Sequence, residues 1–105
     1  MVKPRKPTPA TERLKAERIQ VLAGTVPKWQ LARDQASISR LFQSLPSLRA
    51  AALFAAFAAE IAESQGHTAA LLIREGSVLV TLTTSAAQGL TEKDFQLASR
   101  LELAA

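Results

Sequence analysis

The chain has 105 residues, 48% of them hydrophobic and 21% charged, with a formal net charge of +4. These values are typical of one globular domain that buries about two-thirds of the surface of its unfolded chain. The sequence contains no cysteine, which excludes a disulfide framework, a thiolate zinc site and a cysteine nucleophile.

The first nine residues form a basic, proline-containing leader with Lys3, Arg5 and Lys6. Without these three charges, the net charge of +4 falls to +1. We therefore predict a flexible leader at residues 1–9 and a single domain at residues 10–105. A solvated arm is the preferred interpretation, although the arm could also contact an acidic protein surface. With four phenylalanines, one tryptophan and no tyrosine, the chain lacks the aromatic-rich basic surface typical of nucleic-acid binding.

The longest apolar stretch, residues 45–62, contains Pro46, Arg49 and Glu60 and is rich in alanine. It is too weakly hydrophobic to predict a membrane span. The start of the chain also has no signal-peptide pattern. We expect a cytoplasmic protein.

The first predicted helix covers residues 10–22, with Thr8-Pro9 as its cap and Gly24 after its end. Its apolar face would carry Ala10, Leu14, Ile19 and Leu22. Two strands are predicted next, at residues 26–31 around Trp29 and at residues 37–42.

A long helix is predicted over residues 47–64, ending before Gly66. Apolar residues at helical spacing predict one ridge, formed by Leu48, Ala52, Ala55, Ala59 and Ala62, with Phe54, Phe57 and Ile61 beside it. Its many alanines suit close packing across a sheet or against a partner helix. A β-hairpin follows, with strands at residues 69–74 and 78–84 and a turn at Glu75-Gly76. Alternation along the second strand predicts one buried face, made by Val78, Val80 and Leu82.

The last predicted helix begins at Thr91, with Asp94 as its capping-box partner. Its buried stripe would comprise Leu90, Leu97, Ala98 and Leu101. The element order α-β-β-α-β-β-α predicts an α+β fold, with a four-stranded antiparallel sheet and three helices on one face.

Four segments of the sequence resemble the pterin-4a-carbinolamine dehydratase family. They are Ala62-Glu63, His67, Leu82-Thr83-Thr84 and the sequence GLTEKDFQLA at residues 89–98. The resemblance implies the same α+β fold, which in this family is commonly assembled into dimers or tetramers.

The chain departs from the family at its working motif, a His-His-Pro after the long helix and a further histidine after the fourth strand. The matching positions here hold His67, Thr68 and Ala69, and then Ser85. Carbinolamine dehydration needs a proton donor and a proton acceptor, and imidazole serves both roles near neutral pH. Each lost acid or base typically costs about 10²–10⁴ in rate. We therefore expect a degenerate pocket at His67, Thr68 and Ser85, no catalytic residue and no enzyme activity.

For His67, a capping or surface histidine is the preferred interpretation. A nucleophile–base pair of Ser85 and His67 would lack an orienting acid. One histidine, no cysteine and only four glycines, each at an element boundary, predict no metal site and no cofactor.

A divergent branch of the family, the RuBisCO assembly factor of α-carboxysomes, shares this loss of histidines. The resemblance to that branch implies a non-catalytic assembly chaperone that binds the RuBisCO large subunit. We expect a homodimer, with carboxysome association as a further expectation. Two alternatives stay open: a residual 4a-hydroxytetrahydrobiopterin dehydratase and a dimerisation cofactor with the dehydratase fold.

Four residues are candidates for partner contact because tryptophan and arginine are enriched at binding hot spots. They are Trp29, Arg33, Asp34 and Arg74. The plain alternative makes Trp29 a core anchor and the arginines solvated.

Overall fold

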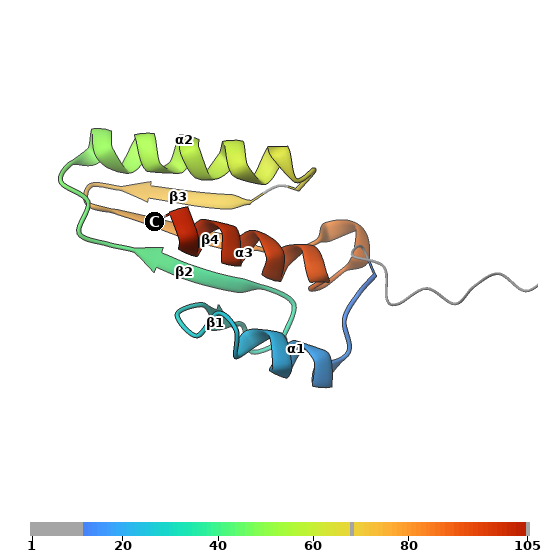
Figure 1. Cartoon of the computed structure of the whole chain (residues 1–105). Helices are drawn as coiled ribbons and strands as arrows, with labels where there is room; N and C mark the ends of the chain where they lie inside the picture. The colour runs from blue at the N-terminus through green and yellow to red at the C-terminus, as the bar shows by residue number, and fades with distance from the viewer. Residues whose placement is uncertain (1–11, 68, 105) are drawn as a thin grey trace, which may run out of the picture.

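The computed structural model describes residues 12–67 and 69–104. It confirms the predicted α+β fold, in which helices cover one face of a four-stranded antiparallel sheet (Figure 1). The elements are α1 (Ala16–Ala23), β1 (Gln30–Leu31), β2 (Ile38–Phe42), α2 (Leu48–Ser64), β3 (Ala70–Arg74), β4 (Ser77–Leu82), the 3₁₀ turn η1 (Ser85–Ala87) and α3 (Glu92–Ala104). The predicted leader and the Thr8-Pro9 cap lie outside the described residues.

The sheet has the strand order β1-β2-β4-β3, so β4 lies inside it and β3 forms one edge. Both β2 and β3 pair with β4 over five residues each. Val78, Val80 and Leu82 on β4 are fully buried, as their alternation predicted. The residues between them point to the opposite face. That outer face carries a row of three paired leucines, Leu41, Leu79 and Leu72.

Helix α2 packs on the sheet through its smallest side chains. The Ser47 hydroxyl caps the helix by accepting a hydrogen bond from the Ala50 N–H at 3.1 Å. The buried residues are Ala51, Ala55, Ala58 and Ala62. The predicted ridge matches this buried face only at Ala55 and Ala62, and its first member, Leu48, is 55% exposed. Alanine lets the helix backbone approach the strands closely, whereas large side chains on this face would hold it away.

The N-terminal part of the fold differs from the prediction in two places. Helix α1 begins at Ala16 because the Leu14 N–H donates to the Leu90 carbonyl at 2.8 Å, which holds the preceding segment outside the helix. Strand β1 has only two residues. Before it, turn hydrogen bonds such as Trp29 N–H to Val26 C=O at 3.0 Å replace the predicted extended segment.

A carboxylate on α3 connects this helix to β2 and to the turn before β1. Glu102 accepts a hydrogen bond from the Trp29 indole N–H at 2.9 Å and forms an ion pair with Arg40. The Arg40 guanidinium also lies 4.3 Å from the centre of the Phe42 ring. At the other end of α3, Glu92 pairs with Arg18 of α1 at 2.9 Å. The hydrogen bond from Arg18 to Glu92 and the negative charge of Glu92 raise the pKa of Arg18.

Within the described ranges, no helix is both long and apolar enough to cross a membrane.

Candidate functional site

Three chain segments meet where α2 ends, β4 ends and α3 begins. Gly66 adopts a positive φ of 68° after α2, and the His67 N–H donates to the Ala62 carbonyl at 2.9 Å. This turn directs His67 toward the first turn of α3. Thr84 reaches the same place from β4, because its backbone pairs with Gly89 through the Thr84 N–H and the Gly89 carbonyl at 3.0 Å.

Asp94 is the centre of the resulting polar network and is completely buried. One carboxylate oxygen, Oδ2, accepts hydrogen bonds from the Thr84 hydroxyl at 2.7 Å and the Thr91 N–H at 2.9 Å. The other, Oδ1, lies 2.6 Å from Nε2 of His67. The bond to the Thr91 N–H is the predicted capping contact, and the position in the first turn of a helix favours a negative charge.

His67 is a buried partner of this carboxylate, with 8% of its surface exposed. A surface position for His67 is therefore wrong, whereas its backbone does make a capping contact at the end of α2. The expectation that no acid orients His67 is also wrong, because Asp94 contacts the ring directly. A carboxylate that holds an imidazole in one orientation is the arrangement that general acid–base sites use. We call His67, Thr84, Thr91 and Asp94 the His–Asp network.

The other two residues of the predicted pocket lie differently. Ser85 follows Thr84, begins η1 and is exposed. Thr68 lies outside the described residues.

Of the four candidates for partner contact, the structure removes one. Trp29 is only 5% exposed and its indole is bound to Glu102, so it is a core residue. Arg33 and Asp34 are exposed between β1 and β2, where the Asp34 carboxylate accepts from the Ala36 N–H at 3.0 Å. Arg74 is exposed at the end of β3. Partner contact through these three exposed residues stays a prediction.

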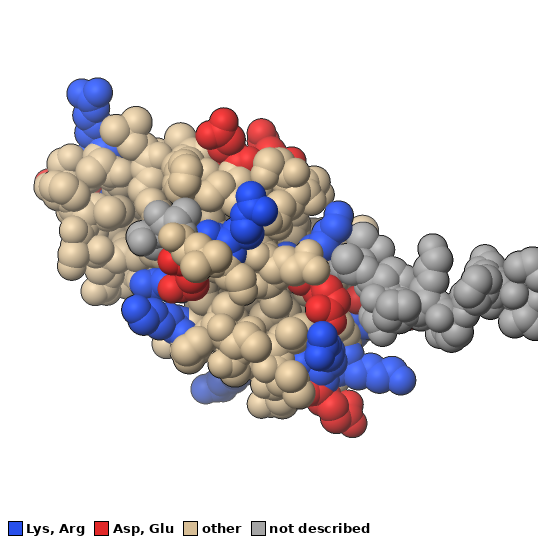
Figure 2. Space-filling model, viewed as in Figure 1, with Lys and Arg blue, Asp and Glu red and all other residues tan. Residues whose placement is uncertain are grey.

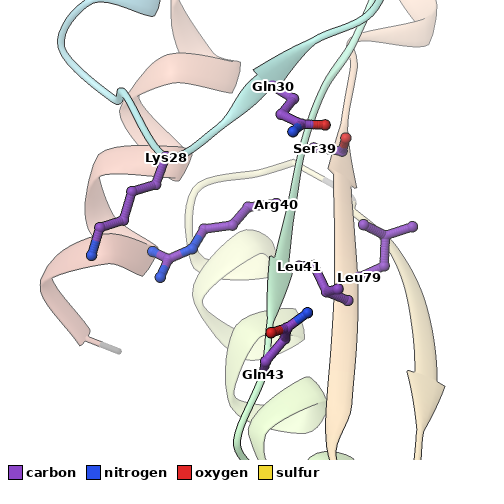
Figure 3. A pocket seen from close by; sticks show the side chains of 7 residues that line it. All are labelled: Lys28, Gln30, Ser39, Arg40, Leu41, Gln43 and Leu79. Carbon is purple, nitrogen blue, oxygen red and sulfur yellow. The ribbon is translucent and has the colours of Figure 1, made fainter.

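A hollow of about 800 Å³ lies away from the His–Asp network, along β1, β2 and β4 (Figure 3). Arg40 and Leu41 point to opposite sides of β2 in this view. The hollow thus follows the sheet and includes part of its outer face. Its lining comprises Lys28, Gln30, Ser39, Arg40, Leu41, Gln43 and Leu79.

In the described part of the chain, His, Asp and Glu side chains form no group of three or more that could hold a metal ion.

The family model for pterin 4 alpha carbinolamine dehydratase matches residues 12–104, nearly the whole chain. The chain belongs to the pterin-4a-carbinolamine dehydratase family. His67 and Asp94 both lie in the matched segment, as do the positions that hold Thr68 and Ser85.

Relatives of known sequence and structure agree with this assignment. A protein of Roseiflexus sp. RS-1 named "putative pterin-4-alpha-carbinolamine dehydratase" is 38% identical over 90 residues, covering 86% of this chain and 94% of the relative. A protein of the same name from Paracoccus denitrificans is 35% identical over 91 residues, covering 87% of this chain and 84% of the relative. The crystal structure of a transcriptional coactivator/pterin dehydratase from Brucella melitensis superimposes with a TM-score of 0.81. It is 28% identical, and the match covers 90% of this chain and 99% of that one.

These relatives correct one expectation from the sequence. We expected no enzyme activity because two family histidines are replaced, yet the relatives carry the name of an enzyme. The described network also retains a buried His–Asp contact. Membership of a dehydratase family therefore replaces the non-enzyme assignment.

Proposed function

We propose that this member of the dehydratase family assists the assembly of RuBisCO in the α-carboxysome system by binding the large subunit during folding or assembly. The observation that carries the proposal is that the histidine motif departs from the family pattern while the fold around it is retained. Thr68 and Ser85 occupy positions where the family resemblance places histidines, whereas the elements around them keep the family fold. This combination is the one that resembles the assembly-factor branch.

The outer face of the sheet supports a binding role. Leu41 and Leu72 are 45% and 50% exposed there, and Leu79 pairs with both of them between the two strands. Leu72 belongs to β3, which is an edge strand of the sheet. The unpaired backbone groups of an edge strand can form hydrogen bonds with another chain. Arg74 at the end of β3 adds a positive charge. Permanent subunit interfaces are rich in apolar surface, so a large subunit that awaits assembly is expected to expose surface that such a face would cover.

Co-expression tests this proposal. The chain, produced together with the large and small subunits, is expected to raise the yield of soluble RuBisCO holoenzyme several-fold. The double variant Leu41→Glu/Leu72→Glu is expected to lose this effect, because carboxylates on the leucine row oppose apolar contact. Leu103→Glu is the matched control, since Leu103 is 87% exposed on α3.

An unchanged holoenzyme yield with the natural chain would contradict the proposal. A coactivator role, which the name of the Brucella melitensis protein includes, predicts that unchanged yield. Equal loss in the outer-face variant and the Leu103→Glu control would remove the outer face from the proposal.

Dehydration of a pterin carbinolamine is the second candidate function. It is favoured by one specific observation, the 2.6 Å contact between His67 and Asp94 in a buried network. In this role His67 would exchange a proton with the substrate, and Asp94 would hold the ring in place. The turnover of 4a-hydroxytetrahydrobiopterin by the purified chain tests this candidate independently of RuBisCO.

A further inference from the structure

Strand β1 is shorter than the strand beside it, which leaves part of β2 open on that side. The pairing with β1 covers only two residues of β2, Ile38 and Ser39. On its other side, β2 pairs with β4 through to Phe42. Before β1 the chain bends into a turn, in which the Trp29 N–H donates to the Val26 carbonyl at 3.0 Å. In the described chain, the part of β2 after Ser39 therefore has no strand partner on the β1 side.

The backbone of Leu41 faces this open side. Hydrogen-bonded pairs alternate along an antiparallel ladder, and the Ala32 N–H donates to the Ser37 carbonyl at 3.0 Å. In steps of two from Ser37, the backbone groups of Ser39 and then of Leu41 also point toward β1. Strand β1 reaches the position opposite Ser39, but none of its residues lies opposite Leu41. The N–H and C=O of Leu41 are therefore available to an added strand.

The hollow of about 800 Å³ along β1, β2 and β4 lies at this place, and Leu41 is part of its lining. Figure 3 shows Lys28 and Arg40 extending to one side of β2, whereas Leu41 and Leu79 lie on the other side. Side chains alternate between the two sides of a strand. An added strand would thus present every second residue to the cations and the residues between them to the leucines.

The charge in the hollow favours a carboxylate. The Arg40 guanidinium is paired with Glu102 and lies over the Phe42 ring. Lys28 is exposed and has no ion-pair partner among the residues that the structure describes. Two cations beside one carboxylate leave one positive charge uncompensated. A segment with an acidic side chain would compensate it, whereas the basic leader of this chain would be repelled.

We infer that a segment of the RuBisCO large subunit adds a strand to β2 in this hollow, in line with β1. Its backbone pairs with Leu41, an acidic side chain pairs with Lys28, and apolar side chains cover Leu41 and Leu79. In strand addition, main-chain hydrogen bonds provide affinity and alternate side chains provide specificity. The inference rests on the proposed function, since it names the chemistry of the segment that is bound. It uses the side of the sheet opposite to β3.

Charge variants of the full chain test the ionic contact, by titration with large subunits that are held before small subunits are added. Lys28→Glu should weaken binding about tenfold, because an attractive contact becomes repulsive. Lys15→Glu is the matched control, because Lys15 is exposed before α1 and does not line the hollow. This control should bind like the natural chain. A higher salt concentration should weaken the natural complex and reduce the difference between the two variants.

The outcomes of this titration separate the inference from the proposed function. Failure of the natural chain to bind the large subunits would contradict both. Binding by the natural chain that Lys28→Glu and Lys15→Glu leave unchanged, or weaken equally, would overturn the inference alone.

A substitution at Leu41 tests the backbone pairing. Leu41→Pro removes the N–H that faces the open side, whereas the ladder between β2 and β4 keeps its hydrogen bonds. Leu41→Ala is the control, because it shortens the same side chain and keeps the N–H. With both variants shown to be folded by circular dichroism, Leu41→Pro should bind the large subunits about tenfold more weakly than Leu41→Ala. Equal affinities would contradict the strand pairing.

Cross-linking identifies the occupant of the hollow and does not depend on the folding of Leu41→Pro. The chain has no cysteine, so Gln43→Cys can carry a single thiol-attached photo-cross-linker in the lining of the hollow. This variant should become joined to the large subunit. Leu103→Cys, at a position that is 87% exposed on α3, should give much less product. Equal yields from the two positions, or a Gln43→Cys product that contains two copies of this chain instead, would overturn the inference.

Discussion

Replacing Asp94 with alanine is expected to lower the free energy of unfolding by about 3–5 kcal/mol. The carboxylate is completely buried and receives hydrogen bonds from the Thr84 hydroxyl and the Thr91 N–H, besides its contact with His67. Its removal leaves these groups buried without their acceptor and disconnects the ends of α2 and β4 from α3. Since domains are stable by only about 5–15 kcal/mol, a large share of the stability would be lost.

Urea denaturation of the purified variants measures this loss. Asp34→Ala is the matched control, because Asp34 is exposed and its carboxylate accepts one local hydrogen bond from the Ala36 N–H. That variant is expected to lose less than about 1 kcal/mol. Equal losses in the two variants would show that the His–Asp network does not hold these segments together.

Restoring the missing histidines is expected to produce the largest change in chemistry. The double variant Thr68→His/Ser85→His should dehydrate 4a-hydroxytetrahydrobiopterin faster than the natural chain by about 10²–10⁴ for each imidazole that acts as acid or base. The physical reason is that hydroxyl groups do not exchange protons near neutral pH as readily as imidazole does. Steady-state turnover at saturating substrate measures the gain.

The same assay separates the roles of the three positions. Adding His67→Ala to the double variant should remove much of the restored activity, because His67 then no longer transfers protons. The single variants Thr68→His and Ser85→His should each give intermediate rates. The Roseiflexus relative, named "putative pterin-4-alpha-carbinolamine dehydratase", provides the reference rate. A natural chain that already matches this reference would show that Thr68 and Ser85 do not limit the reaction.

Local pattern predicted those parts of the fold in which periodicity alone decides burial. The alternation in β4 identified Val78, Val80 and Leu82, and the helical spacing in α3 identified Leu97, Ala98 and Leu101, all of which are buried. The start of α1 could not be predicted in this way. It depends on a hydrogen bond between Leu14 and Leu90, which are distant in sequence.

For α2, the sequence offered two apolar faces. The predicted ridge of Leu48, Ala52, Ala55, Ala59 and Ala62 shares Ala55 and Ala62 with the buried face, but close packing on the sheet buries Ala51 and Ala58 in place of the other three. The larger residues Leu53 and Phe57 were consequently left exposed on the outer side of the helix. To decide which face is buried, one must know how closely the helix approaches the sheet. Hydrophobic periodicity gives no information on that distance.

The site was only half visible in the sequence. His67 was identified, but Asp94 was interpreted as a helix cap, and their separation of 27 positions in the sequence concealed their contact. The available signal was the sequence Gly-Leu-Thr-x-x-Asp, which the capping interpretation used only in part. The structure shows that its carboxylate is completely buried and also contacts His67. For Trp29, partner contact and a core position were both considered, and its 5% exposure and its bond to Glu102 favour the core position.

Binding to RuBisCO at different stages of assembly tests the proposed function most directly. Isothermal titration or co-elution can compare the purified chain with newly folded large subunits, held before small subunits are added, and with finished holoenzyme. The proposal predicts binding to the large subunits and much weaker binding to the holoenzyme. Absence of binding to the large subunits, or equal binding to both forms, would contradict it.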